Sequence, residues 1–264
     1  MGVVSVVEKI FVFIFGAIVG SFLNVCIYRI PKGRSIVAPG SHCPNCGAGI
    51  QWFDNIPILS YIILGGRSRC CKTRISLRYI IVEILTAFLF LVLFLFFGLT
   101  AKFFAYMILV CALIIATFVD FEIQEIPDEV SLGGLAVGLL LSVAFPSILN
   151  EPSRIHSFLN SFFGAFAGAA TIYAMGMLGE FAFKKEAMGG GDVKLLAMIG
   201  SFIGWKMTLL AFFIAPLFGS IVGIILKIRQ GKDIIPYGPY LSLAAVTAIL
   251  WGDKILKLLF SGLY

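Results

Sequence analysis

Charged residues are scarce in this sequence. Only 13% of its 264 residues are charged, well below the roughly 25% that is typical of soluble globular domains. The chain also has no internal repeat that we can identify and no low-complexity tract. The first shortage excludes an ordinary soluble domain, and the absence of repeats excludes a repeat architecture.

Hydrophobic residues fill the chain instead. They make up 60% of the sequence, and the mean hydropathy is +1.03. The apolar residues fall in runs separated by short polar joints, and about 20 apolar residues are needed to cross the hydrocarbon core of a bilayer. We therefore predict an all-α polytopic membrane protein with about eight transmembrane helices in the lipid bilayer. The predicted spans cover residues 8–29, 79–99, 103–119, 130–149, 157–181, 192–204, 207–228 and 237–259.

The basic residues predict the orientation of these spans. Lysine and arginine are enriched in the short loops that stay on the cytoplasmic side, and here they gather in residues 31–78, near 184 and near 229. This pattern places both termini outside, in a multi-pass protein of the cytoplasmic membrane. The net charge of +6 is then explained by this bias and by attraction to anionic lipid, so it implies no nucleic-acid partner.

One loop is long enough to form a module of its own. Residues 31–78 are polar, basic and rich in turn residues, and they hold four of the six cysteines. We therefore expect three parts in the chain. These are a first transmembrane helix over residues 1–30, a small cytoplasmic module over 31–78, and a transmembrane part over 79–264.

Two aspartates are predicted to lie at the same membrane boundary. Asp120 ends the third span and Asp192 begins the sixth, and the two spans between them return the chain to the same side. Ionisable groups within a membrane protein's spans are costly to bury and are often functional. We therefore expect the two carboxylates to face one site, although about seventy residues separate them.

A carboxylate pair of this kind can divide the work of an acid and a base. Two carboxylates within hydrogen-bonding distance do not both ionise easily, so one keeps a proton while the other takes a proton from water. Gly189, Gly190 and Gly191 precede Asp192. Glycine allows a close approach to a peptide backbone and dihedral angles that other residues avoid. The pattern is typical of a hydrolytic site.

Other roles remain open for these acids. Asp192 is also a suitable N-cap for the sixth helix, and Asp128, which follows Pro127, is a suitable N-cap for the fourth. Asp120 is equally suited to anchor its helix at the boundary. A transporter or channel would use such carboxylates to bind cations or relay protons. That alternative requires charged partners deeper in the membrane, but the third to eighth predicted spans are almost free of charge in their middle, and the sequence has no inverted repeat.

Four cysteines of the loop have the character of a metal site. Cys43 and Cys46 form a C-x-x-C pair, and Cys70 and Cys71, about twenty residues later, are adjacent. Two C-x-x-C pairs at this distance are typical of a zinc ribbon, and a reducing cytoplasm favours metal binding over disulfides. Because adjacent cysteines need a distorted backbone to share one metal, three outcomes stay open. Zn²⁺ binds all four thiolates, it binds three thiolates with His42 or water, or no metal binds.

Several motifs follow one another along nearly the whole chain. The segment from Asp120 to Asp128 reads D-x-x-x-x-x-I-P-D, and Gly189 to Asp192 reads G-x-G-D. Three further segments are GSFLNVCIYRIP at 20–31, SHCPNCGAGIQWFDNIPILSYIILGGRSRCCKTRISLRYIIVE at 41–83, and IPYGPYLS at 235–242. The G-x-G-D motif alone is weak, but the whole set, in this order, resembles the type IV prepilin peptidases, which are membrane aspartyl proteases of the GxGD type.

The resemblance implies a bifunctional enzyme of the bacterial inner membrane. Asp120 and Asp192 would be the catalytic pair, the three glycines and Asp128 would belong to the active-site loop, and residues 79–264 would form the peptidase domain. The family cleaves the basic leader of type IV prepilins and type II secretion pseudopilins at the cytoplasmic face. It then N-methylates the new amino terminus with S-adenosylmethionine.

The resemblance also connects the loop module with the methyltransferase. It implies roles in methyl transfer for Asp54 and for Glu83. Of these two acids, Glu83 would meet the new ammonium group of the client. The alternative for Glu83 is an ion pair with Arg78 or Arg74. The module departs from the family pattern, because Ser68 stands at the third cysteine position. The sequence has no glycine-rich signature of a soluble methyltransferase, so it does not locate a pocket for S-adenosylmethionine.

Overall fold

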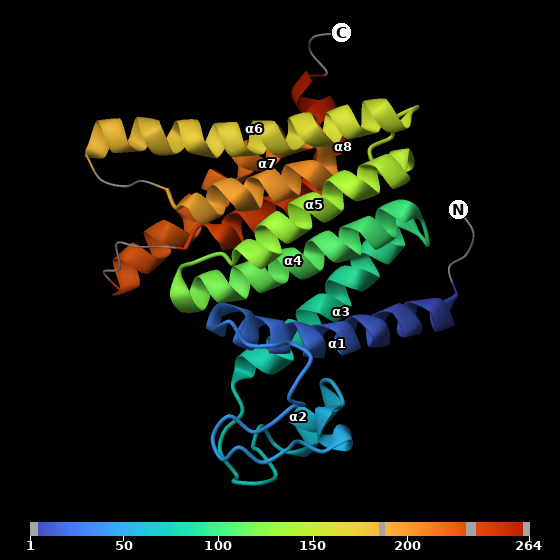
Figure 1. Ribbon diagram of the computed structural model, residues 1–264, viewed down its shortest axis with the longest axis vertical. Coiled ribbons are helices and arrows are strands. Elements are labelled where there is room, and N and C mark those ends of the chain that lie inside the picture. Colours follow the sequence, from blue (N-terminus) through green and yellow to red (C-terminus); the bar gives the residue numbers. More distant parts are fainter. Residues whose placement is uncertain (1–4, 185–187, 231–235, 261–264) are drawn as a thin grey trace. The chain divides into compact units, whose positions relative to one another are not determined.

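The regular secondary structure of the described residues consists of helices, joined by turns and irregular loops. The computed structural model describes residues 5–184, 188–230 and 236–260, with their side chains except at 183 and 223–230. Within these ranges it contains isolated β-bridges but no strand (Figure 1). The long helices are α1 (Val6–Arg29), α3 (Leu77–Phe97), α4 (Ala101–Ile123), α5 (Asp128–Ala144), α6 (Arg154–Phe183), α7 (Gly190–Gln230) and α8 (Gly238–Phe260). The short ones are η1 (Ile30–Lys32), η2 (Trp52–Asn55), α2 (Leu59–Ile63) and η3 (Pro146–Ile148).

The predicted fold class is confirmed, but the predicted count of eight spans is not. Five helices of the described chain are long and apolar enough to cross a membrane, and they cover Val6–Lys32, Leu77–Phe97, Ala101–Ile123, Arg154–Ala182 and Gly190–Val222. Helix α5 has only 17 residues, fewer than the roughly 20 needed for a full crossing. Helix α7 combines two of the predicted spans in one element of 41 residues.

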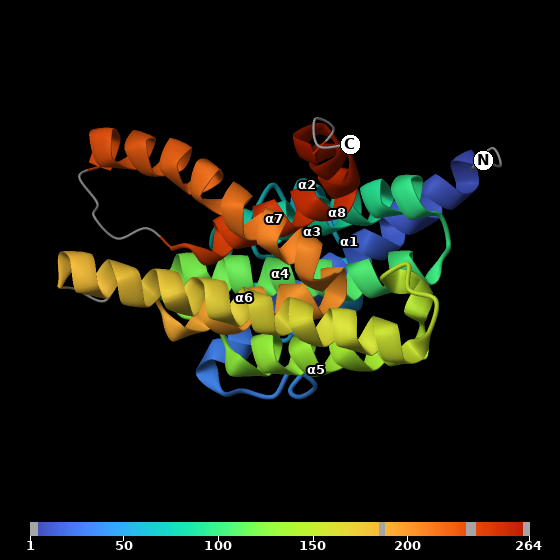
Figure 2. The same cartoon turned by 90° about the horizontal axis from the view of Figure 1, so that it is seen from above.

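A break at Gly204 divides α7 where the sequence predicts the end of one span. Gly204 has φ 74° and ψ 168°, which are not helical values. A Cβ atom there would lie 2.5 Å from the Asn160 Oδ1 atom on α6. The same Oδ1 accepts a hydrogen bond of 3.2 Å from the Trp205 backbone N–H, so a side chain replaces the helical partner that the break removes. Figure 2 shows the resulting change of direction in α7.

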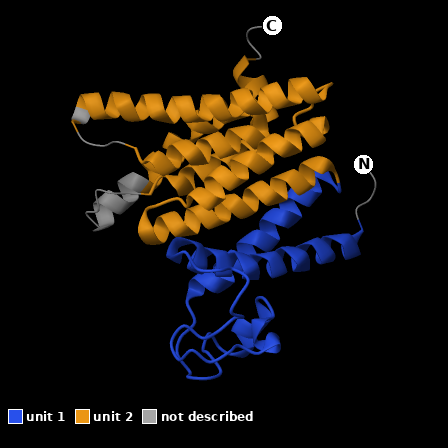
Figure 3. Cartoon of the chain, viewed as in Figure 1, with its two compact units in different colours: residues 1–99 blue, residues 100–264 orange. Residues whose placement is uncertain are grey.

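The contacts divide the chain into two compact units. Unit 1 comprises residues 1–99 and unit 2 residues 100–264 (Figure 3). Helix α3 therefore belongs with α1 and the cysteine loop by its contacts. The predicted three-part division at residues 30 and 78 stays a prediction.

Small residues bring α1 and α3 together in unit 1. A Cβ atom on Gly16 would lie 2.7 Å from the Ala87 Cα atom, and one on Gly20 would lie 2.8 Å from the Glu83 Cα atom. Without a hydrophobic drive between helices in lipid, such close backbone approach is a main source of association. The approach of α1 at Gly20 also fixes where the carboxylate of Glu83 lies.

The same device joins α6 to α7 in unit 2. Gly164 and Gly200 face each other so closely that neither has room for a side chain, and Gly168 packs against the backbone of Leu196. Helix α7 also packs against α5 and α8, and α4 packs against α8. The N-terminal half of α7 is therefore central to unit 2, which places its first turn beside the ends of α4 and α8.

Candidate active site

Asp120 lies in the last turn of α4 and is buried, with 5% of its surface exposed. The helix ends one turn later at Gln124, which adopts a left-handed conformation with φ 56° and donates its N–H to the Asp120 carbonyl at 3.0 Å. This cap turns the chain sharply after Ile123 into the segment that contains Ile126. The sequence placed Asp120 at the end of this helix, and the structure agrees.

The backbone of α8 contacts the Asp120 carboxylate directly. The N–H of Gly238, the first residue of α8, donates to Asp120 Oδ2 at 2.9 Å. A helix N-terminus carries unpaired N–H groups and a partial positive charge that favours an anion. A Cβ atom at Gly238 would lie 2.8 Å from the same oxygen. In the sequence, Gly238 stands out only as part of the segment IPYGPYLS, which does not reveal this contact.

Asp192 lies in the first turn of α7 and meets Asp120 at one site. Asp192 is half-buried, and its charge interacts with that of Asp120. Ile126 connects the two, because it lies within 3.3 Å of a Cβ atom built at Gly238 and within 3.2 Å of one built at Gly191. The two aspartates therefore lie in the same region of unit 2, and their role as a catalytic pair stays a prediction.

The glycine run has a narrower role than predicted. None of Gly189, Gly190 and Gly191 has a positive φ, so the expected use of unusual dihedral angles is wrong. A side chain at Gly190 would meet open space, whereas one at Gly191 would press on Ile126. Gly189 contributes its carbonyl, which accepts the Asp192 N–H at 3.1 Å. Of the three glycines, only Gly191 makes a close approach, and its neighbour is Ile126.

The capping alternatives for two aspartates are not supported. Helix α7 begins at Gly190, so Asp192 lies inside its first turn rather than before it. Helix α5 has Pro127 as its N-cap residue, without a side-chain cap, and Asp128 is its first residue. The Asp128 carboxylate instead pairs with Lys194 Nζ at 2.6 Å. This exposed ion pair links the start of α5 to the start of α7, beside Asp192.

The four cysteines of the loop converge on one point in unit 1. The Sγ atoms of Cys43, Cys46, Cys70 and Cys71 all lie within 4.8 Å of one another. The Cys43–Cys71, Cys46–Cys70 and Cys70–Cys71 sulfur distances are 3.6, 3.2 and 3.9 Å. Four thiolates around one Zn²⁺ at about 2.3 Å would lie about 3.8 Å apart. The donor set therefore fits a tetrahedral metal.

A strained turn allows adjacent cysteines to share the cluster. Lys72, directly after the pair, has φ 58°, and its N–H donates to the Ser68 carbonyl at 3.0 Å. Ser68 hydrogen bonds through Oγ to Cys71 Sγ at 3.1 Å. Hydrogen bonds from Ser68 and Thr73 lower the pKa of Cys71 to about 5. Cys71 is therefore a thiolate at neutral pH, the form that binds metal.

His42 is not part of this cluster in the described structure. Its Nδ1 lies 3.1 Å from the Gly40 carbonyl oxygen, to which it can donate, and the group of metal-binding side chains comprises cysteines alone. The arrangement favours four thiolates over three thiolates with His42.

The two acids that the resemblance connects with methyl transfer lie in different surroundings. Asp54 forms a two-pronged ion pair with Arg69, whose Nε lies 2.8 Å from Asp54 Oδ2. Glu83 is buried on α3, with 7% of its surface exposed. It accepts the N–H of Ile58 at 2.7 Å and a hydrogen bond from Ser21. Neither donor belongs to Arg78 or Arg74, the residues of the alternative ion pair considered from the sequence.

Fold and site together describe a multi-pass helical membrane protein with a pair of converging aspartates and a four-cysteine module. Residues 14–97 match the family described as bacterial peptidase A24 N-terminal domain, and residues 107–224 match the type IV leader peptidase family. The chain belongs to the type IV leader peptidase family.

Curated relatives extend this match over most of the chain. A prepilin leader peptidase/N-methyltransferase of Pseudomonas aeruginosa is 35% identical over 92% of this chain and 90% of its own length. One of the same name from Aeromonas salmonicida is 32% identical over 93% and 91%. A type 4 prepilin-like proteins leader peptide-processing enzyme of Escherichia coli is 35% identical over 89% and 90%. No solved structure matches the chain.

Proposed function

We propose that this protein removes the leader peptide from prepilin-like clients and then methylates the new amino terminus. The observation that carries the peptidase half is the meeting of Asp120 and Asp192 from helices far apart in sequence, in a chain of the type IV leader peptidase family. The names of the relatives support the transferase half. Family membership also argues against the transporter alternative.

The peptidase step uses the two aspartates as acid and base. One carboxylate takes a proton from a water molecule, whose oxygen attacks the carbonyl carbon of the scissile peptide bond. The other donates its proton to the carbonyl oxygen, which gives a neutral tetrahedral intermediate. The intermediate collapses when the first carboxyl group gives its proton to the leaving nitrogen, the carbon–nitrogen bond breaks, and the second carboxylate takes a proton from one hydroxyl group. Asp120 Oδ2 accepts the Gly238 N–H, so a proton carried by Asp120 resides on Oδ1.

The transferase half is assigned to unit 1. S-adenosylmethionine would supply a methyl group on a sulfonium sulfur. Within unit 1, Glu83 is a buried carboxylate suited to an ammonium group, and Asp54 braces the loop through Arg69. The four thiolates would hold Zn²⁺ and so fix the fold of the loop rather than take part in the chemistry.

We also propose the orientation that the basic residues predict. Both termini lie outside the bacterial inner membrane, and the aspartate pair lies at the cytoplasmic boundary. This side suits a client with a basic leader that precedes an apolar helix. Its support is the positive-inside bias of the loops.

The paired substitution of the aspartates tests the peptidase assignment. Asp120→Asn and Asp192→Asn should each abolish leader removal from a co-expressed precursor, followed as a mobility shift on a gel. Asp253→Asn is the matched control, because Asp253 is an exposed acid near the other end of α8. If either active-site variant reaches normal membrane levels and still cleaves at the wild-type rate, the assignment is wrong.

A further inference from the structure

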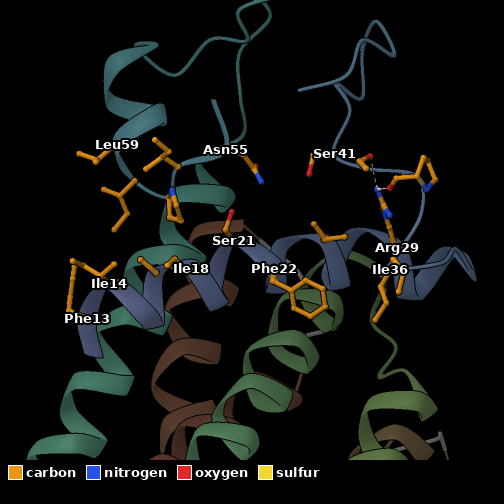
Figure 4. A pocket seen from close by; sticks show the side chains of 18 residues that line it. Phe13, Ile14, Ile18, Ser21, Phe22, Arg29, Ile36, Ser41, Asn55 and Leu59 are labelled. Atoms are coloured by element: carbon orange, nitrogen blue, oxygen red, sulfur yellow. Dashed lines mark hydrogen bonds between the residues drawn. The ribbon is translucent and has the colours of Figure 1, made fainter. Parts of the chain in front are cut away.

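Unit 1 contains a cavity of about 790 Å³ that the predicted sites do not use. One wall is a face of α1 that includes Ile14, Ile18 and Phe22, and the opposite wall is formed by residues 36–41 and 55–59 (Figure 4). The walls are mostly apolar, and the cavity follows α1 over several turns. A long apolar ligand therefore fits it better than a compact polar one.

The one basic side chain among the described lining residues is hydrogen bonded to the backbone of the loop. Arg29 is buried, with 6% of its surface exposed. Its guanidinium donates to the carbonyl oxygens of Ser35, Pro39 and Gly40 at 3.0, 2.8 and 3.2 Å. These bonds hold the loop against α1 and occupy three N–H groups of the guanidinium. A phosphate group in this cavity would have to compete with the three carbonyl oxygens for these N–H groups.

A carboxylate lies directly behind the wall. Glu83 on α3 is bonded by Ser21 and Ile58, and both of these residues line the cavity. In Figure 4 the Ser21 side chain points from α1 toward the loop that carries Asn55 and Leu59. An ionised carboxylate offers about four acceptor positions, so two donors leave capacity for a further one. A ligand with a cationic end would find its partner here.

The backbone at this point is held in a conformation that it would not adopt alone. Ile58 has φ 64° and ψ −51°, and a positive φ in a β-branched residue is a genuine outlier. The conformation directs the Ile58 N–H to Glu83 Oε2 at 2.7 Å. Strain of this kind persists only where the surroundings impose it, and it is concentrated at functional sites.

We propose that this cavity receives the amino-terminal end of the cleaved client, with its apolar side chains along α1 and its free ammonium group at Glu83. The proposal rests on the transferase half of the proposed function, and it names where the methyl acceptor binds. Apolar walls match the body of such a segment, and a buried carboxylate matches its cationic end. An anionic phospholipid matches the walls but not the carboxylate.

The contact with the ammonium group is tested by measuring how two peptides bind to the wild type and to a variant of the full-length protein in detergent. The probe is a synthetic apolar peptide, used with a free amino terminus and with an acetylated one. Acetylation should weaken binding about tenfold in the wild type, because it removes a charge-assisted hydrogen bond. In Glu83→Gln the two peptides should bind within about twofold of each other.

Glu8→Gln is the matched control for this binding comparison. Glu8 is an exposed acid at the other end of α1, and glutamine can keep its capping contact with Ser5. This variant should show the same effect of acetylation as the wild type. If Glu83→Gln retains the full wild-type difference between the two peptides, the proposal is overturned.

A second pair of variants tests the apolar wall without touching Glu83. Ile18 and Ile10 are both on α1 and both 55% exposed, but only Ile18 lines the cavity. Ile18→Trp should weaken binding of both peptides about tenfold or more by filling the cavity, while Ile10→Trp should leave it unchanged. If Ile18→Trp instead expels co-purifying phospholipid and leaves peptide binding intact, the cavity is a lipid site and the proposal fails.

These readouts separate the inference from the proposed function. Precursor cleavage and transfer of labelled methyl groups are measured on the same preparations. If the wild type methylates clients but acetylation weakens peptide binding equally in the wild type and in Glu83→Gln, the proposed function stands and the inference fails. If the wild type transfers no methyl group, the transferase proposal fails. A binding difference between the free and the acetylated peptide that disappears in Glu83→Gln still supports binding at the cavity.

Discussion

The backbone N–H of Gly238 donates to the Asp120 carboxylate at 2.9 Å, although 118 residues separate them in sequence. The contact joins the start of α8 to the end of α4 beside Asp192. It holds one oxygen of Asp120 as an acceptor and leaves the other free for water or substrate. In this family member, the start of the last helix therefore positions one of the proposed catalytic groups.

Gly238→Ala should impair catalysis more than folding. The added methyl group would lie 2.8 Å from Asp120 Oδ2 and 3.3 Å from Ile126 Cδ1, so the carboxylate has to move. We expect the rate of leader removal to fall about 10-fold to 100-fold, as small misplacements of reacting groups produce, with near-normal membrane levels. Gly133→Ala in α5 is the control, because its methyl group would meet no atom within 4 Å. Equal rates for both variants would contradict the positioning role.

Purified protein should contain one Zn²⁺ per chain. Cys71→Ser should remove most of it, because Cys71 lies 3.6 Å from Cys43 and 3.9 Å from Cys70 within the cluster. Cys111→Ala in α4 should leave the metal content unchanged. Metal analysis of the three proteins measures this. A full equivalent of zinc in Cys71→Ser would show that the other thiolates suffice.

Zinc binding to the metal-free protein should release protons at neutral pH. An Ala48 backbone hydrogen bond lowers, and the Cys70 thiol raises, the pKa of Cys46, and the net value is about 12. Cys46 must therefore lose a proton when it binds metal, whereas Cys71, with a pKa of about 5, is already ionised. Affinity should consequently fall with falling pH. Calorimetry in buffers of different ionisation enthalpy counts the protons, and release of none would contradict the four-thiolate site.

The Asp54–Arg69 pair should stabilise the loop down to acidic pH. Hydrogen bonding to Arg69 lowers the pKa of Asp54 in the folded state. A depressed carboxyl pKa contributes stability above the unfolded value of about 3.9, and the contribution is lost as the pH falls through the lower folded value. Hydrogen exchange of residues 52–55 and 67–70 in the full-length protein should show protection at pH 5 and 7 that Asp54→Asn lacks. Equal exchange of the two proteins at neutral pH would contradict this role.

Asn160→Ala should destabilise unit 2 at the break in α7. The variant removes the acceptor of the Trp205 N–H and the donor to Glu151 Oε1, which lie at 3.2 and 2.7 Å. Each lost hydrogen bond costs about 1 kcal/mol, so the apparent Tm in detergent should fall by several degrees. Glu151→Ala removes only the second of these hydrogen bonds and should lower the Tm less. An unchanged Tm for Asn160→Ala would show that the break is held by packing alone.

Much of this protein follows from local patterns along the chain. The apolar runs specify helices and a membrane, because length and hydropathy are properties of a single segment. The prediction that Asp120 and Asp192 share one membrane boundary rests on the alternation of the predicted spans. The cysteine spacing likewise predicts the metal-binding loop, and the ordered motifs predict the family.

Contacts between distant segments required the folded structure. Hydropathy cannot show that Gly238 donates to Asp120, that Cys70 turns into the cluster beside Cys71, or that Ile58 is strained toward Glu83. It also cannot show the cavity, which exists because two loops fold over α1. Such contacts depend on how side chains and backbones pack at a few ångströms, and packing of this kind is a property of the whole unit rather than of any one stretch of residues.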